Sequence, residues 1–289
     1  MRILITGAFG QLGHALQSIL SKKSNYELIC TGRKVKKGQE GIPLDIRNQV
    51  ALKELINTTA PDILINLAAM TNVDACELNP KLAGEINVAG LQHICDSFKG
   101  KIIHLSTDYV FDGTSGPYKE DDPLNPLSIY GKTKLASEHI LLEKDIKNLV
   151  IRGNVLYDYS PHTSASFLNW VVSSLKDNQE IKVVEDQFNN PTWTRSMSDI
   201  IELSIENDLE GIIHWGDSVH ISRYEFAKLI AKKFSLNDSL IKPVLTSELN
   251  QPARRPLQSG LSTEKLVNML DIIPPSIDDC LDEIIKIAQ

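Results

Sequence analysis

Short apolar runs alternate with longer amphipathic segments along the first half of the chain. Five runs are apolar nearly throughout and predict strands at residues 2–6, 27–32, 63–68, 101–106 and 148–153. The stretches between them, such as "QLGHALQSIL" and "NQVALKELINTT", place apolar residues at helical spacing. Strands without a polar face, separated by helices, are typical of a parallel sheet covered on both sides. The pattern therefore predicts an α/β fold with a doubly wound parallel sheet, whose ligands bind at the carboxyl ends of the strands.

The alternation of predicted strands and helices ends after residue 153. Helical segments dominate the second half, and "HISRYEFAKLIAKKF" is the clearest of them. Between these segments, "TWTRSMSDIIELSIEN" and "GIIHWG" resemble the first half again. We therefore expect two domains with a cleft between them: a large one of residues 1–153 plus about 193–215, and a smaller, discontinuous one of about 154–192 plus 216–289.

Composition and charge exclude several classes of function. The chain has 289 residues and a net charge of −7, without a basic patch for nucleic acid. Its longest apolar run, "ILINLAAM", is too short to cross a membrane, and no leader precedes the first strand, so we expect a cytoplasmic protein. Four widely spaced cysteines indicate free thiols and no metal site: Cys30, Cys76, Cys95 and Cys280.

A glycine-rich turn joins the first predicted strand to the first helix. In "ITGAFGQLGHAL", three residues carry this turn: Gly7, Gly10 and Gly13. Glycine allows tight turns and close approach of the backbone, and a helix N-terminus presents free N–H groups to a diphosphate. The spacing is G-x-x-G-x-x-G, a variant of the dinucleotide signature. The larger domain is therefore predicted to bind a dinucleotide cofactor.

The end of the second strand indicates which cofactor. A carboxylate at that place would hold the ribose hydroxyls of NAD(H), whereas a cation accommodates the 2′-phosphate of NADP(H). The sequence "CTGRKVKK" offers no carboxylate but has Arg33 and Lys34. We favour NADPH over NADH; the alternative is that these cations belong to a solvated loop.

Two tyrosines precede a lysine by four residues, which places each pair on one helix face. Tyr130 and Lys134 follow "LSTDYVFDG", where Ser106 and Thr107 supply hydroxyls at a strand end. A nearby ammonium favours the phenolate, so such a pair suits proton donation to a carbonyl. Tyr224 lies instead in an amphipathic helix whose apolar residues indicate core packing. We therefore expect Tyr130 to be the functional tyrosine.

Several motifs together resemble the extended short-chain dehydrogenases/reductases. They are the glycine turn, "NLAAMTNVDACE", "INVAG", "LSTDYVFDG", "YGKTKLASE", "DQFNNPTW" and "ARRP". Within that family the chain is most similar to the dTDP-4-dehydrorhamnose reductases, over essentially its whole length. The resemblance implies a Rossmann-like cofactor domain, a substrate-binding domain, and NADPH-dependent reduction of a 4-keto sugar nucleotide in deoxysugar biosynthesis.

The resemblance also implies roles for individual residues. The catalytic set would be Thr107, Tyr130 and Lys134, with Asn87 supporting the lysine. Cofactor contacts would come from Gly7, Gly10, Gln11 and Leu12 at the pyrophosphate, Asp45 and Ile46 at the adenine, and Ala68, Ala69 and Thr71 at the ribose and nicotinamide. The sugar would be bordered by Asp108, Tyr109 and Val110, and Arg254 or Arg255 would face the diphosphate.

The sequence departs from its relatives at two places. Val155 stands where reductases of this branch usually carry a tryptophan against the sugar, so we expect a wider pocket. His14 and Ala15 replace an acidic residue that some members use for a metal-bridged dimer, which leaves a monomer or a homodimer. Two alternatives stay open, namely an epimerase and a non-catalytic, NADP-binding regulatory subunit. A dehydratase is disfavoured because Tyr109 follows Asp108 where a glutamate is needed.

Overall fold

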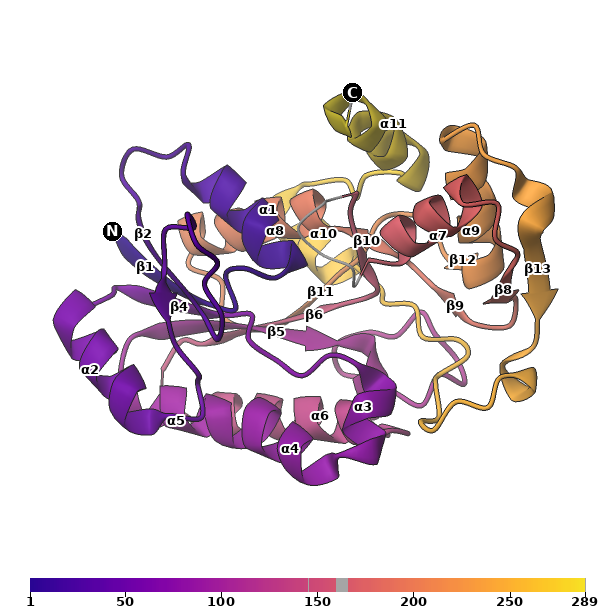
Figure 1. The fold of residues 1–289 in the computed structure, drawn as a ribbon. Helices are drawn as coiled ribbons and strands as arrows, with labels where there is room; N and C mark the ends of the chain where they lie inside the picture. The colour runs from indigo at the N-terminus through magenta and orange to yellow at the C-terminus, as the bar shows by residue number, and fades with distance from the viewer. Residues whose placement is uncertain (145, 160–165, 289) are drawn as a thin grey trace.

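A computed structural model describes residues 1–144, 146–159 and 166–288. Its central feature is a seven-stranded sheet in the order β11-β6-β5-β4-β1-β2-β3, in which every recorded pair is parallel (Figure 1). The chain order reverses beside β1, which opens a crevice at the carboxyl ends of β1 and β4. The predicted doubly wound sheet is confirmed. The strands are β1 (Arg2–Thr6), β2 (Glu27–Gly32), β3 (Ile42–Pro43), β4 (Ile63–Asn66), β5 (Lys101–Thr107), β6 (Leu149–Gly153) and β11 (Gly211–Trp215).

Helices cover both faces of this sheet (Figure 1). One face carries α1 (Gln11–Leu20), α8 (Thr194–Glu206) and α10 (Glu264–Leu270). The other carries α2 (Gln49–Thr59), α3 (Val73–Leu78), α4 (Pro80–Gly84), the π-helical turn η1 (Glu85–Ala89), α5 (Gly90–Ser97) and α6 (Ile129–Leu142). Along β1, Ile3 and Ile5 pack into the first core and Leu4 into the second. Burial on both faces explains why the strands lack a polar side.

A smaller helical part lies beyond the carboxyl ends of the strands (Figure 1). Its core joins Tyr157, Leu168, Phe226 and Leu281. It contains α7 (Phe167–Lys176), α9 (Arg223–Lys233), α11 (Ile277–Ala288) and the parallel pair β8 (Ile181–Val184) and β13 (Ile241–Val244). Short elements complete it: β7 (Leu156–Tyr157), β9 (Phe188–Asn189), β10 (Thr192–Trp193), β12 (Ile221–Ser222) and the 3₁₀ turns η3 (Asp238–Leu240) and η4 (Thr246–Glu248). The division of labour between the two parts stays a prediction.

Some boundaries differ from those expected. β4 ends at Asn66, two residues before the predicted end of 63–68, because the Asn66 side chain accepts a hydrogen bond from the Ala68 N–H at 3.3 Å and turns the chain. β5 continues to Thr107, and the two-residue β3 was not anticipated. Among the described residues, no helix is long and apolar enough to cross a membrane.

Candidate functional site

The glycine turn lies at the carboxyl end of β1 and opens α1. Gly7 has φ +72°, and a Cβ there would lie 2.7 Å from the backbone nitrogen of Ala68. Gly10 is the N-cap of α1 and leaves this helix end without a side-chain cap. Gly13 packs the helix onto the turn, since a Cβ there would lie 2.3 Å from the Ala8 carbonyl oxygen. Only glycine fits at the first and third positions, and the helix N-terminus stays open for a ligand.

The residues around this helix end fit a dinucleotide diphosphate. The side-chain nitrogen of Gln11 is buried and has no hydrogen-bond partner among the described residues. A buried donor without a partner is costly, and an anion at the helix N-terminus would satisfy it. Leu12 is buried in the core, so only its backbone can face such a ligand.

The predicted adenosine end is rich in paired charges. Arg33 is exposed after β2, as is the neighbouring Lys34. Asp45 forms a bidentate pair with Arg47, and this hydrogen bonding lowers the pKa of the Asp45 carboxyl. Ile46 is buried behind it. Asp45 and Arg47 line a surface pocket with Asn48, Glu85, Ala89 and His93.

The loop after β4 carries Ala68, Ala69 and Thr71, and a buried asparagine holds this loop. Asn87 accepts a hydrogen bond from the Met70 N–H at 2.8 Å and donates to the Met70 carbonyl at 3.2 Å. Its amide also donates to the Thr133 hydroxyl at 3.0 Å. Asn87 thus ties the loop to α6 one residue before Lys134. It lies in η1, and π-helical turns are frequent at functional sites.

Thr107 and Tyr130 meet at the carboxyl end of β5. Thr107 ends the strand, and Tyr130 lies in the first turn of α6, which the Ser128 hydroxyl caps by accepting from the Gly131 N–H at 3.2 Å. Burial raises the pKa of Tyr130 well above its usual value, although a hydrogen bond with Thr107 acts in the opposite direction. At neutral pH Tyr130 therefore keeps the proton that a general acid must donate.

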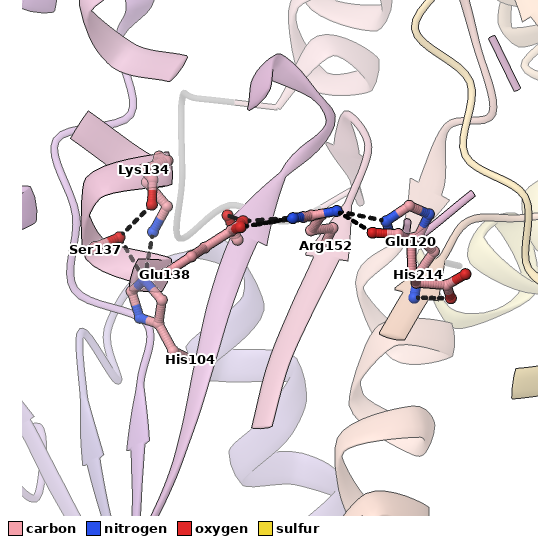
Figure 2. Close-up of polar contacts among 8 residues, drawn as sticks. His104, Glu120, Lys134, Ser137, Glu138, Arg152 and His214 are labelled. Carbon is pink, nitrogen blue, oxygen red and sulfur yellow. Dashed lines mark hydrogen bonds and ion pairs between the residues drawn. The ribbon is translucent and has the colours of Figure 1, made fainter. Parts of the chain in front are cut away.

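The lysine of the pair is buried one helical turn after Tyr130 in α6. Its Nζ donates to the Leu105 carbonyl at 2.6 Å and lies 3.0 Å from His104 Nε2 (Figure 2). Burial lowers the pKa of Lys134 to about 8. Ser106, by contrast, donates its hydroxyl to Glu138 and faces away from the strand end.

The second tyrosine–lysine pair belongs to the smaller part. Tyr224 packs against that part's core from α9. Lys228 forms an ion pair with Asp238. Of the two pairs, only Tyr130 and Lys134 lie at the carboxyl edge of the sheet.

The residues expected to border the sugar differ in how far their side chains are buried. Asp108 is buried, which raises the pKa of its carboxyl to about 6. The Tyr109 ring meets the Tyr130 ring edge-on, with centroids 5.6 Å apart. Val110 is fully buried, so only its backbone can serve a ligand. Val155 is half-buried between β6 and β7, where its carbonyl accepts from the Thr192 N–H at 3.2 Å.

The arginines near the expected substrate site differ in their partners. Arg255 forms an ion pair with Asp74 at 2.7 Å, so its charge is already neutralised, and Arg254 is exposed. Arg223, at the start of α9, lies over the Phe167 ring at 5.2 Å and close to Tyr109. Within the described ranges it has no ion pair. Nothing in the sequence singled out Arg223, because the apolar pattern of its helix is explained by core packing alone.

Known proteins are similar to this chain over nearly all of its length. The family model described as "RmlD substrate binding domain" matches residues 1–289. A dTDP-4-dehydrorhamnose reductase of Aggregatibacter actinomycetemcomitans is 31% identical and covers 100% of this chain and 99% of its own. The crystal structure of a dTDP-4-dehydrorhamnose reductase from Bacillus anthracis in complex with NADP has TM-score 0.90 and 30% identity, covering 99% and 98%. Methionine adenosyltransferase 2 subunit beta of Xenopus laevis is 31% identical, covering 93% and 82%.

Proposed function

The chain belongs to the RmlD substrate binding domain family, and from this premise we propose that it reduces the 4-keto group of a dTDP-linked 4-keto-6-deoxy sugar with NADPH. It is an oxidoreductase of the extended short-chain dehydrogenase/reductase type. The observation that carries the proposal is the position of Thr107 at the carboxyl end of β5, next to Tyr130 in the first turn of α6, with Lys134 one helical turn further along. The contribution of each residue to the site is itself part of the proposal.

The chemistry of the site follows from its protons and charges. The bound cofactor supplies a hydride to the keto carbon. Tyr130 donates its phenolic proton to the keto oxygen, and the Thr107 hydroxyl orients that oxygen. The positive charge of Lys134 stabilises the phenolate that forms. Gly7, Gly10 and Gln11 hold the cofactor diphosphate at the start of α1.

We assign the substrate diphosphate to Arg223 in place of Arg254 or Arg255. Its guanidinium has no carboxylate partner in the described part of the chain, and Phe167 fixes its plane. Arg223→Gln should raise KM for the sugar nucleotide about 10- to 100-fold, because charge-assisted hydrogen bonds contribute about 1.5–3 kcal/mol. Steady-state kinetics at saturating NADPH measure this change. Arg254→Gln, on an exposed arginine, is the matched control, and equal effects of the two variants would contradict the assignment.

Cofactor choice supplies a separate prediction. Arg33 and Lys34 stand exposed where the 2′-phosphate of NADPH would lie. Replacing both with glutamine should weaken NADPH binding about tenfold or more and leave NADH binding nearly unchanged. Fluorescence titration with both cofactors tests this. Equal weakening of both would place these cations outside the site.

The proposed activity is tested by mixing pure protein, NADPH and dTDP-4-keto-6-deoxy sugars and following NADPH consumption. An epimerase would interconvert the sugars without net consumption, and a regulatory subunit would bind NADPH without turnover. Comparable rates on two stereoisomers would agree with the short Val155 side chain. In the described part of the chain, no group of three or more His, Cys, Asp or Glu residues could hold a metal ion. Cytoplasmic location and a monomer or homodimer stay predictions.

A further inference from the structure

A buried histidine faces the amine of Lys134. His104 lies on β5, and its Nε2 is 3.0 Å from Lys134 Nζ (Figure 2). Burial and the neighbouring lysine charge hold the pKa of His104 well below its usual range. The ring is therefore neutral at physiological pH and carries one hydrogen, either on Nδ1 or on Nε2.

The neighbours of the ring decide which nitrogen carries this hydrogen. Asn66 Nδ2 lies 3.0 Å from His104 Nδ1. Asn66 Oδ1 is already used, since it accepts from the Thr6 hydroxyl at 2.6 Å and from the Ala68 N–H. The amide N–H of Asn66 therefore points at the ring, which favours Nδ1 as its acceptor. This arrangement favours the tautomer of His104 whose hydrogen lies on Nε2.

The groups near Nε2 agree with this assignment. Ser137 Oγ lies 3.1 Å from Nε2, and its own hydrogen goes to the Lys134 backbone carbonyl at 2.6 Å. Ser137 can therefore only accept from His104. The same Nε2–H also faces Lys134 Nζ, so the lysine meets a donor and not a lone pair. An amine can accept this hydrogen, whereas an ammonium cannot.

His214 shows the opposite arrangement in the same molecule. Its Nδ1 lies 3.1 Å from the Tyr118 carbonyl, so its hydrogen lies on Nδ1. Its Nε2 lone pair then accepts from Arg152 Nη1 at 3.2 Å (Figure 2). An arginine is always charged and needs such an acceptor. At Nε2, His214 therefore offers a lone pair to its cation, whereas His104 offers a hydrogen to Lys134.

We propose that His104, oriented by Asn66, is a positioning residue that sets the charge of Lys134 during the reduction proposed above. The amine form of Lys134 accepts the Nε2 hydrogen and keeps its place. The ammonium form loses this contact and keeps the Leu105 carbonyl as acceptor. Proton uptake by Lys134 is thereby coupled to the loss of its contact with His104.

Other ionisable groups around Lys134 do not replace this effect. Glu138 raises the pKa of Lys134, but its carboxylate is bound by Arg152 and Ser106. Tyr130 is neutral, and Cys76 of α3, a thiol with pKa raised to about 11, donates to the Met70 carbonyl. The His104 hydrogen is thus the uncharged contact that decides between the two forms of the lysine.

The tautomer can be measured directly, without substrate. In ¹⁵N-histidine-labelled protein, the two ring nitrogens have different shifts when protonated and when not, and loss of a signal in His104→Gln assigns the residue. We expect the hydrogen on Nε2 in His104 and on Nδ1 in His214. The Asn66 backbone carbonyl raises the pKa of His104 and is the alternative acceptor for an Nδ1 hydrogen. A hydrogen on Nδ1 of His104 would overturn the proposal.

The effect on catalysis is tested by the pH profile of kcat/KM. In the natural protein, kcat/KM should fall as the pH rises through the lysine's pKa of about 8, because Lys134 then loses its charge. In Asn66→Asp, the carboxylate accepts a hydrogen from Nδ1, and the Nε2 lone pair then favours the ammonium. The falling limb should move upward by about one pH unit or more, a tenfold change in the protonation equilibrium.

Two further variants keep this test decisive. His104→Gln can turn its amide oxygen toward Lys134 and should shift the limb in the same direction, even if Asn66→Asp folds poorly. His214→Gln removes a buried histidine away from the lysine and should leave the limb in place. If the falling limb of the kcat/KM profile stayed in place in both Asn66→Asp and His104→Gln, the role of His104 would be overturned. Absence of turnover by the natural protein on every 4-keto sugar would instead count against the proposed function, and the tautomer measurement would still stand.

Discussion

Replacing Tyr130 with phenylalanine should lower turnover of a 4-keto sugar nucleotide about 100- to 10,000-fold, the usual contribution of a general acid. The phenylalanine keeps the ring that packs edge-on against Tyr109 but lacks the hydroxyl that contacts Thr107. NADPH affinity should change little, since the cofactor loses no more than one contact. Stopped-flow hydride transfer and a fluorescence titration with NADPH measure the two quantities separately.

Tyr224→Phe is the matched control, because it makes the same change in the other tyrosine–lysine pair. Tyr224 packs on the core of the smaller part, far along the chain from the strand end that carries Thr107. Turnover of this variant should stay within about twofold of normal, because Tyr224 lies outside the proposed site and the substitution removes one hydroxyl. Equal losses in the two variants would show that the choice between the pairs was wrong.

The position of Tyr130 and Lys134 at the carboxyl edge of the sheet was predictable from the sequence for a physical reason. The strands of a doubly wound sheet are buried on both faces, so "KIIHLS" is recognisable as a strand and the polar residues after it must lie at the carboxyl edge. The glycine turn is equally local, because Gly7 and Gly13 are required by contacts that a Cβ would prevent. Features set by the backbone of consecutive residues could thus be predicted.

Features set by contacts between distant segments could not. Ser106 and Thr107 are adjacent hydroxyl residues, and only the packing of α6 shows that Ser106 binds Glu138 while Thr107 meets Tyr130. Likewise, the sequence does not show that the guanidinium of Arg255 is bound by Asp74, 181 residues away. Charge type is visible in a sequence, but the partner that neutralises a charge is not.

The largest effect on stability is expected at the buried pair between α6 and β6. Arg152 and Glu138 are 0% and 1% exposed at their side chains, and two guanidinium nitrogens bind the carboxylate, the shorter contact at 2.8 Å (Figure 2). Glu138→Ala leaves the arginine charge in the core with the His214 ring, the Glu120 carbonyl and the Phe111 face as its remaining contacts. We expect a loss of about 3–5 kcal/mol in the free energy of unfolding, measured by urea denaturation.

Two further variants show whether the loss in the free energy of unfolding comes from the unpaired buried charge or from the lost packing and hydrogen bonds. Glu210→Gln removes a carboxylate from an exposed pair with Lys147 and should change the free energy of unfolding by less than about 1 kcal/mol. The double variant Glu138→Met with Arg152→Met removes both buried charges, so it should be more stable than Glu138→Ala alone. If the double variant were instead as unstable as the sum of the two single changes, the cost would lie in packing and in the hydrogen bond from Ser106. The buried charge would then not be the reason for the loss.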